Sequence, residues 1–249
     1  MKFGVFCRAI ASAGVASMAA GASAIVINIG SLKDNTLYES ASGALSSGAG
    51  PTMFAGKTAT GAIRRGLIAF DIAGNVPVGA TINSATLRLN MTNTAGGAAP
   101  VALHRSLQNW GEGTSNAGVG GGMGAAATNG DATWVHTFFN TSNWSSLGGS
   151  FSASASASTS VDGIGLYSWN SAQLTADVQS MLNNPGGNFG WILRGDESSN
   201  LTAKRFETRE SASASLRPIL VVEYTPVPEP ATLAILGTGV LFLRRRRSH

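Results

Sequence analysis

Thr81–Asn93, with the sequence TINSATLRLNMTN, alternates apolar and polar side chains along its length. On one side lie the apolar residues Ala85, Leu87, Leu89 and Met91. On the other side lie the polar residues Thr86, Arg88, Asn90 and Thr92. Because successive side chains of a strand point to opposite faces of its sheet, the stretch predicts a β-strand with one buried and one hydrated face. This pattern is typical of an antiparallel sheet in a sandwich.

Other segments on both sides of this stretch predict further strands. Ile63–Ile72 places three large apolar side chains, those of Ile68, Phe70 and Ile72, on one face. Phe151–Val161 alternates mostly small apolar residues with serines, which is consistent with a linker but favours a strand with a hydroxyl-bearing face. We expect additional strands at Ile25–Ile29, Val101–Leu107, Asp131–Asn140, Phe189–Leu193, Lys204–Glu210 and Pro218–Tyr224.

One segment, Ser171–Asn183, predicts a helix. Its apolar residues recur at helical spacing and form a single stripe, namely Leu174, Val178, Met181 and Leu182. Asn170 or Ser171 can cap the first turn, and the sequence Asn-Pro-Gly-Gly that follows the segment ends the helix. The helix is therefore short and amphipathic, and we expect it to cover one face of the strands.

Together these elements predict an all-β fold, a jelly-roll-like antiparallel β-sandwich with one short α-helix. The 249 residues include 32 glycines, and only 12% are charged, which suits short strands joined by tight turns. A glycine-rich tract within Asn109–Gly130 has no phosphate-binding fingerprint and predicts a long flexible loop. The central part of the chain, residues 25–225, is long enough to form one domain with its own core.

The N-terminal segment has the pattern of a secretory signal peptide. Two basic residues, Lys2 and Arg8, precede an apolar run of small residues, and Ala22 and Ala24 supply an A-x-A cleavage site. We expect residues 1–24 to form a signal helix that directs the chain to the Sec export machinery and is then removed. The mature protein would begin directly after the cleavage site.

The C-terminal segment, residues 226–249, has three parts. The first contains Val227, Pro228, Glu229 and Pro230. An uncharged apolar run follows at Ala231–Leu243, and the third part is the basic cluster Arg244, Arg245, Arg246 and Arg247. A helix over the apolar run would cover about 20 Å, less than the ~30 Å hydrocarbon core of a bilayer. We still expect a C-terminal hydrophobic anchor helix, with the arginines on the cytoplasmic side of the membrane.

This three-part order resembles the PEP-CTERM sorting signal. The resemblance implies that an exosortase recognises the segment and cleaves it near Pro228–Pro230. It also implies export to the cell envelope or extracellular matrix of a Gram-negative bacterium that produces exopolysaccharide.

The formal net charge of +4 comes from the two ends of the chain. Outside them remain 11 of the 17 basic residues and 12 of the 13 acidic residues, so the central domain is close to neutral. Without a basic surplus, the domain lacks the electrostatic attraction on which nucleic-acid binding depends. The single cysteine, Cys7, lies in the signal peptide, so the mature chain has no disulfide or thiol chemistry.

The order of short motifs in the central domain resembles the DNRLRE-type domain. The motifs are Asp34–Glu39, Arg64–Asp71, Val78–Leu89 and Asn109–Thr114. Domains of this type are similar to the jelly-roll carbohydrate-binding modules of polysaccharide lyases and cell-surface proteins. For residues 25–225 the resemblance implies a β-sandwich that binds polysaccharide weakly and without catalysis.

No catalytic constellation is evident in the sequence. His104 and His136 lie in strand-like segments and have no zinc-ligand spacing around them. A carboxylate pair can be drawn between Asp196 or Glu197 on one side and Glu207 or Glu210 on the other, but a chain with this many acids offers such pairs by chance. We therefore predict that the protein is not an enzyme and has no catalytic residues.

No metal site is predicted with definite ligands. Asp34, Asp71 and Asp131 could contribute to a structural Ca²⁺ site of the kind that jelly rolls hold, but no D-x-D-x-D spacing supports one. No cofactor is expected.

Glycan-binding surfaces use exposed aromatic rings that stack on sugars. Trp110, Trp144 and Trp169 lie in or beside loops, and Trp144 is the best exposed candidate because polar residues flank it. Trp134 and Trp191 lie inside apolar runs and are expected in the core.

The sequence thus predicts an exported protein, sorted by its PEP-CTERM tail, that binds polysaccharide weakly and non-catalytically. One alternative is a purely structural surface or biofilm protein without a specific ligand. A second alternative is a small polysaccharide lyase or hydrolase.

Overall fold

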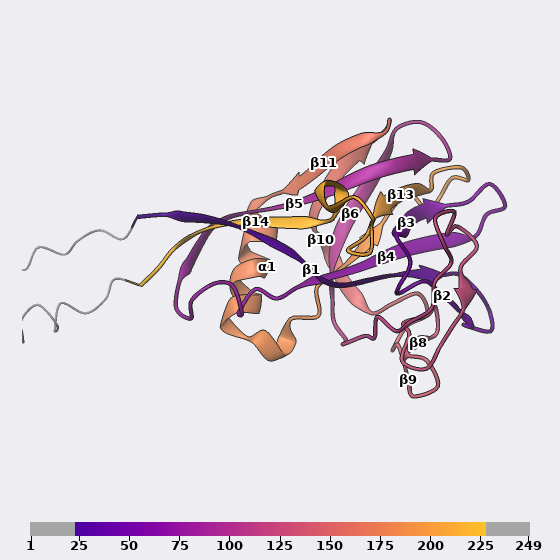
Figure 1. Ribbon diagram of the computed structural model, residues 1–249, viewed down its shortest axis with the longest axis horizontal. Helices are drawn as coiled ribbons and strands as arrows, with labels where there is room; N and C mark the ends of the chain where they lie inside the picture. Colours follow the sequence, from indigo (N-terminus) through magenta and orange to yellow (C-terminus); the bar gives the residue numbers. More distant parts are fainter. Residues whose placement is uncertain (1–22, 228–249) are drawn as a thin grey trace, which may run out of the picture. The chain divides into compact units, whose positions relative to one another are not determined.

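The computed structural model describes residues 23–227, which contain many strands and one α-helix (Figure 1). The longer strands are β1 (Ile25–Tyr38), β3 (Thr52–Lys57), β4 (Ile63–Phe70), β5 (Thr81–Thr94), β6 (Ala99–Ser106), β10 (Phe151–Val161), β11 (Gly165–Asn170), β12 (Trp191–Arg194), β13 (Lys204–Glu207) and β14 (Ile219–Thr225). Shorter elements are β2 (Leu45–Ser46), β7 (Ala125–Ala126), β8 (His136–Phe138), β9 (Ser142–Asn143) and the 3₁₀ turns η1 (Pro185–Gly187) and η2 (Ala214–Leu216). The helix is α1 (Ala172–Asn183). The predicted signal and anchor helices lie outside the described residues.

Two antiparallel sheets are joined by strands that belong to both. The first half of β1 pairs with β14, from Ile25 opposite Tyr224 to Gly30 opposite Ile219. After a bulge at Ser31–Lys33 the second half pairs with β4. Strand β3 likewise pairs with β13 and then with β4. The first sheet therefore runs β1-β14-β5-β13-β3 with β11 beside β5, and the second runs β1-β4-β12-β6-β10. An all-β fold with one helix is confirmed.

Strand β5 is the centre of the first sheet. One edge pairs with β14 along Thr81–Arg88 and then with β13, and the other edge pairs with β11. Its apolar residues Ala85, Leu87, Leu89 and Met91 are all buried. The alternation predicted for this stretch is confirmed, because only one face of β5 contacts the core.

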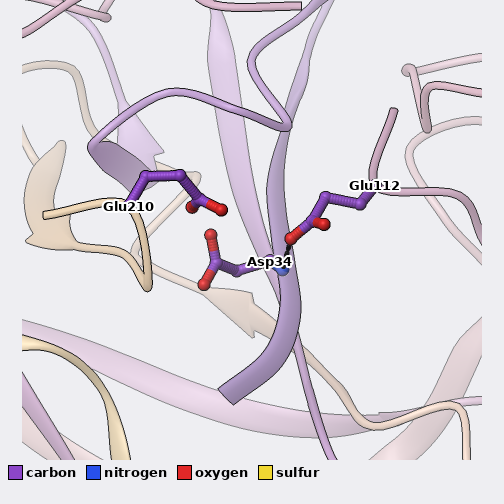
Figure 2. Close-up of side chains that lie close together, drawn as sticks. All are labelled: Asp34, Glu112 and Glu210. Carbon is purple, nitrogen blue, oxygen red and sulfur yellow. Dashed lines mark hydrogen bonds between the residues drawn. The ribbon is translucent and has the colours of Figure 1, made fainter. Parts of the chain in front are cut away.

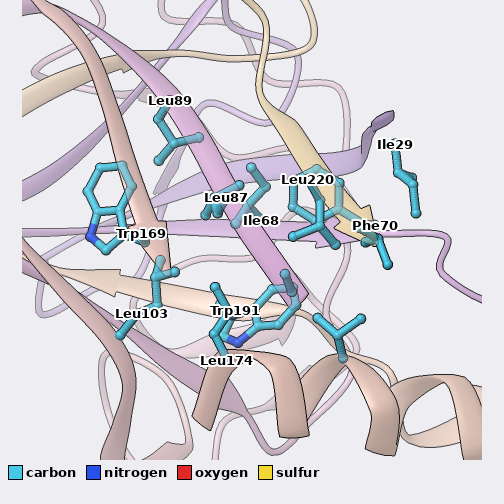
Figure 3. Close-up of a cluster of buried hydrophobic side chains, with 14 of the residues drawn as sticks. Ile29, Ile68, Phe70, Leu87, Leu89, Leu103, Trp169, Leu174, Trp191 and Leu220 are labelled. Atoms are coloured by element: carbon cyan, nitrogen blue, oxygen red, sulfur yellow. The ribbon is translucent and has the colours of Figure 1, made fainter. Parts of the chain in front are cut away.

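The main core lies between the two sheets and under α1 (Figure 3). Leu87 and Leu89 of β5 and Ile68 and Phe70 of β4 belong to one cluster with the apolar stripe of α1. The helix packs against β5 and β10, and it is capped by Ser171, whose Oγ accepts a hydrogen bond from Leu174 N at 2.9 Å. Both the predicted helix and its cap are confirmed.

A second, smaller core covers the opposite face of β4. Leu67 and Ala69 of β4, Ile192 of β12 and Leu37 of β1 pack there against Trp110, Trp134 and Trp144. The tryptophans come from the long connection 107–150 between β6 and β10. Strand β4 is therefore buried on both faces, and its second half, Leu67–Phe70, is apolar without alternation for that reason. The part of this connection that we predicted as a long flexible loop, the glycine-rich tract within Asn109–Gly130, belongs to a packed cover.

The glycine-rich part of this connection lies against β1 and β4. The Tyr38 hydroxyl donates a hydrogen bond to Gly121 O at 2.7 Å, and Arg64 Nε donates one to Gly122 O at 3.1 Å. Gly124 has a φ of +73°, and a Cβ there would be 3.1 Å from the Tyr38 ring. The glycines let the backbone approach the aromatic ring closely.

Four strand predictions differ from the structure. The strand predicted at Ile25–Ile29 is longer, because β1 continues to Tyr38. Strand β10 has the predicted bounds, but bulges shift its register, so that Ser156 is buried and Ala153 is exposed. The segment Asp131–Asn140 contains only the short β8, and its Trp134 packs over the second sheet instead of continuing it. Strand β13 ends at Glu207, and a turn follows.

We predict that Trp191→Ala lowers the free energy of unfolding by about 3–5 kcal/mol, because it leaves a cavity in the main core. The Trp191 side chain is fully buried, and its Nε1 donates a hydrogen bond to Ser156 Oγ at 3.1 Å. Urea denaturation measures the change. The control Ile164→Ala, at a side chain that is 75% exposed, should change stability by less than about 0.5 kcal/mol. Equal effects of the two substitutions would contradict the packing described here.

Candidate functional site

The three tryptophans predicted to bind glycan are buried. Trp110 is 1% exposed, Trp144 6% and Trp169 0%. Each indole N–H donates a hydrogen bond to a backbone carbonyl, of Phe189, Thr133 and Val101 respectively. The prediction that these rings form an exposed platform is therefore wrong. Polar residues flank Trp144 in the sequence, but its ring turns inward to cover the second sheet. Trp134 and Trp191 are in the cores, as predicted.

A cluster of three carboxylates stands out among the described residues (Figure 2). Asp34, Glu112 and Glu210 each offer an oxygen, and these oxygens lie within 4.8 Å of one another. The three residues come from β1, from the cover 107–150 and from the turn after β13, so the fold brings together positions that are far apart in the chain. We refer to this set as the carboxylate cluster.

Asp34 is held by β1 just beyond the bulge. It pairs in register with Ile68 of β4, and it is completely buried. Its Oδ2 accepts hydrogen bonds from the backbone N–H of Arg209 at 3.0 Å and from the Ser31 hydroxyl at 3.2 Å. Its own backbone N–H donates a hydrogen bond to Glu112 Oε1 at 3.0 Å. The orientation of this carboxylate is therefore fixed by one backbone N–H and one hydroxyl group.

Glu112 is positioned by the glycines on both sides of it. Glu112 O accepts a hydrogen bond from the Asn35 side chain at 2.9 Å, which ties the cover to β1. A Cβ at Gly111 would overlap the carbonyl of Gly130, and a Cβ at Gly113 would overlap Asp131 Oδ1. Gly113 also has a φ of +72°. The sequence Trp-Gly-Glu-Gly therefore places a glutamate in a close-packed segment where flanking side chains would not fit.

Arg209 and Glu210 complete the cluster from the turn after β13. Arg209 makes a bidentate pair with Glu112, with Nε–Oε1 at 2.7 Å and Nη2–Oε2 at 2.6 Å. Its Nε also lies 2.9 Å from Glu210 Oε1. The turn is closed by a hydrogen bond from Ser211 N to Thr208 O at 3.2 Å. One arginine thus contacts two of the three carboxylates and reaches the third through its backbone.

The electrostatic environment is unfavourable for three ionised carboxylates. Burial, followed by the nearby charge of Glu210, raises the pKa of Asp34 well above its usual range. Burial also raises the pKa of Glu210, although Arg209 opposes the change. Two oxygens, Asp34 Oδ1 and Glu210 Oε2, are buried without a hydrogen-bond partner in the described part of the chain. Such oxygens are costly unless a proton or a cation lies between them.

The geometry of the cluster suits cation binding better than glycoside hydrolysis. The two carboxyl groups of a glycosidase lie on either side of a bound sugar, whereas Asp34 in this cluster is completely buried. Only oxygen donors are present, which is the donor set that hard cations prefer.

Two of the three predicted metal-ligand candidates lie elsewhere. Asp71 is exposed and its Oδ1 accepts a hydrogen bond from Gly74 N at 2.9 Å. Asp131 accepts one from Thr128 N at 2.6 Å. Of the candidates, the structure brings only Asp34 to the cluster, and sequence reasoning missed Glu112 and Glu210 as its partners. The sequence feature that could have identified Glu112 as a site residue is the glycine on each side of it.

The carboxylates and histidines considered for catalysis have structural partners. Glu197 makes a bidentate pair with Arg65, with Nε–Oε1 at 2.7 Å, and also pairs with Arg194. His104 Nδ1 lies 2.8 Å from Ser152 O, and His136 Nδ1 lies 2.9 Å from Thr133 Oγ1.

A shallow groove lies beside the start of β10. It has a volume of about 350 Å³ and is lined by Arg65, Leu107, Leu147, Phe151 and the serines Ser145 and Ser146, among others. All three guanidinium nitrogens of Arg65 make hydrogen bonds, because Nη1 donates to Gly148 O at 2.7 Å while Nε and Nη2 donate to Glu197. The groove therefore offers two exposed leucines and two exposed serines to solvent.

Comparison with known families gives one match, the PEP-CTERM protein-sorting motif at residues 226–248. It covers the predicted sorting residues Val227 to Pro230 and Arg244 to Arg247 and implies an exosortase as the processing partner. It also implies export to the cell envelope or outer surface. A comparison with curated proteins found no match.

The sorting and signal residues lie mostly outside the described part of the chain. The structure does not describe Ala22, Pro228, Glu229, Pro230 or the four arginines. Ala24 and Val227 are described, and both are exposed. Within residues 23–227, no helix has the length and apolar character needed to cross a bilayer.

We predict that Gly113→Ala destabilises the protein by more than about 1 kcal/mol, since alanine disfavours the positive φ and its Cβ would overlap Asp131. The matched control is Gly120→Ala in the same connection. A Cβ at Gly120 would meet nothing within 4 Å. Thermal unfolding of both variants measures the difference, and equal stability would show that Gly113 is dispensable.

We also predict a pH dependence from His104. Burial lowers the pKa of His104 below its usual value of about 6.5, and the charges of Arg194 and Arg65 act in the same direction. The folded state therefore favours the neutral ring. The contribution of His104 to the free energy of unfolding is fully present above about pH 6.5, and it is lost as the pH falls from about 6.5 toward the lower pKa of the folded state. Denaturant unfolding between about pH 8 and 5.5 should show this slope, and His104→Gln should flatten it. Identical slopes would contradict the prediction.

Proposed function

We propose that the mature domain is a non-enzymatic, jelly-roll-like surface domain that binds matrix polysaccharide weakly. The same proposal includes three further points. The domain is exported by the Sec machinery, it is released from an anchor helix by exosortase cleavage, and it comes from a Gram-negative bacterium. The single observation that carries it is the sorting motif at residues 226–248, which implies that the domain is delivered to the cell envelope or outer surface. There it would meet exopolysaccharide at high local concentration.

Because the tryptophans are buried, we place the proposed binding surface in the groove beside β10 instead. Stacking on an indole ring is not available, because all five tryptophans are 8% exposed or less. The groove beside β10 has a concave shape, exposed apolar side chains in Leu107 (57%) and Leu147 (66%), and serine hydroxyls beside them. Apolar contact combined with a few hydrogen-bonding groups is the composition of small-ligand sites. Without an exposed tryptophan ring, we expect affinity in the weak range.

A purely structural role is the second candidate. It is favoured by the same burial of the tryptophans, and by the ion pairs of Arg65 and Arg209, which engage side chains that could otherwise bind sugars. In this case the groove has no ligand, and the domain contributes a stable folded body to the surface layer.

The proposal that the domain is not an enzyme has support from the contacts of its acids. Glu197 is paired with two arginines, and Glu207 accepts a hydrogen bond from Thr92 at 3.0 Å. In the carboxylate cluster Asp34 is completely buried, whereas the two carboxylates of a glycosidase must both reach a sugar that binds from solvent.

We predict that the purified protein is retained on immobilised exopolysaccharide from its own host and that the double substitution Leu107→Glu and Leu147→Glu reduces retention at least about tenfold. Adding two negative charges to the groove removes its apolar contact with the sugar rings. The control is Val78→Glu, which changes an 86% exposed residue that does not line the groove. Affinity electrophoresis in a gel containing the polysaccharide measures the retention.

Each outcome assigns a function. Retention that only the groove variant loses supports the glycan-binding proposal. If neither wild type nor control is retained, the structural role is correct and the glycan-binding proposal is wrong. Shortening of the polysaccharide chains during incubation would overturn the proposal that the domain is not an enzyme.

A further inference from the structure

We propose that the carboxylate cluster of Asp34, Glu112 and Glu210 is a binding site for one Ca²⁺ ion, which links three distant segments of the domain. This inference is independent of polysaccharide binding, since none of these residues lines the groove beside β10. It rests on the geometry of the oxygens, on two buried oxygens that have no partner, and on the balance of charge around them.

The spacing of the oxygens fits one calcium ion. Ca²⁺ binds oxygen ligands at about 2.3–2.6 Å, so two ligands on opposite sides of the ion are separated by at most about 5 Å. One oxygen from each of the three carboxylates lies within 4.8 Å of the others. Little rearrangement is needed to place an ion between them. Backbone carbonyls and water can complete the six to eight ligands that Ca²⁺ takes.

Two unpartnered oxygens point independently to a ligand. Asp34 is completely buried, and its Oδ1 has no hydrogen-bond partner, although Oδ2 of the same carboxylate accepts two hydrogen bonds. Glu210 Oε2 is also buried and unpartnered. Figure 2 shows the carboxylates of Asp34 and Glu210 directed toward one another. Unpartnered carboxylate oxygens of this kind carry a large desolvation cost that a cation between them would remove.

The charge near the cluster is unbalanced. Arg209 is the one basic side chain that pairs with these carboxylates among the described residues, and it contacts Glu112 and Glu210. Lys33 is nearby, but its ammonium lies over the Trp110 ring at 4.1 Å and donates to Asn109 Oδ1 at 3.0 Å. Three carboxylates therefore face one guanidinium. A divalent cation would leave the group close to neutral.

The donor set selects a hard cation. The cluster contains no histidine or cysteine, which zinc and copper sites use. Mg²⁺ requires near-ideal octahedral geometry at about 2.0–2.1 Å and keeps most of its water, whereas Ca²⁺ accepts irregular arrangements of carboxylates. Glu112 and Glu210 keep side-chain exposures of 17% and 22%, so an ion can enter from solvent.

The test is calcium titration of the purified protein after treatment with EDTA. Isothermal titration calorimetry should show one site, and Ca²⁺ should raise the Tm in differential scanning calorimetry more than Mg²⁺ at the same concentration. Asp34→Asn and Glu210→Gln should each weaken Ca²⁺ binding at least about tenfold and reduce the rise in Tm. Glu223→Gln, which changes a carboxylate outside the cluster, should bind Ca²⁺ like wild type.

The outcomes are distinct. If Asp34→Asn does not fold, Glu210→Gln still tests the site, because Glu210 lies on a turn and is only partly buried. Absence of both binding heat and a Tm rise at millimolar Ca²⁺ would overturn the proposal and leave a shared proton as the link between the two carboxylates. Binding that persists unchanged in both cluster variants would place the Ca²⁺ site elsewhere and would also overturn it.

Discussion

The burial of the second sheet on both faces is the constraint from which the other features follow. β4 contacts the main core through Ile68 and Phe70 and the smaller core through Leu67 and Ala69. Apolar surface on the outer face requires a cover, because leaving it in water would cost about 25 cal/mol per Å². The connection 107–150 provides this cover and contributes three tryptophans to it. Two of the tryptophans predicted to bind glycan, Trp110 and Trp144, therefore cover this smaller core.

The same constraint determines where sequence reasoning succeeds and where it fails. The alternation in β5 and the stripe of α1 depend on neighbours a few residues away, so periodicity alone identifies both elements. The side on which Trp144 lies depends on packing in the smaller core with residues of β1 and β4 that are more than 70 residues away in sequence. Its polar neighbours in the sequence do not reveal this packing. The end of β13 at Glu207 depends in the same way on Arg209 N reaching Asp34, and it moves Glu210 out of the strand in which we predicted it.

For a related reason, the spacing of residues along the sequence could not predict the carboxylate cluster. Metal motifs that can be recognised in a sequence place several ligands on one loop or helix, whereas here each segment supplies one. Asp34 was considered together with Asp71 and Asp131 because all three are aspartates. The strand register places Asp34 beside Glu112 and Glu210 instead. What the sequence does contain is a local sign of close packing, the glycines on both sides of Glu112.

The position of the cluster suggests how an ion would act on the fold. β1 joins the two sheets through its bulge at Ser31–Lys33, and Asp34 follows the bulge directly. Glu112 belongs to the cover of the second sheet, and Glu210 follows a strand of the first sheet. An ion held by all three would therefore join both sheets and the cover at one point. Extracellular calcium modules bind with dissociation constants of about 10⁻⁴–10⁻³ M. A site in that range would be filled outside the cell, so the domain would gain this link only after the export that its sorting motif implies.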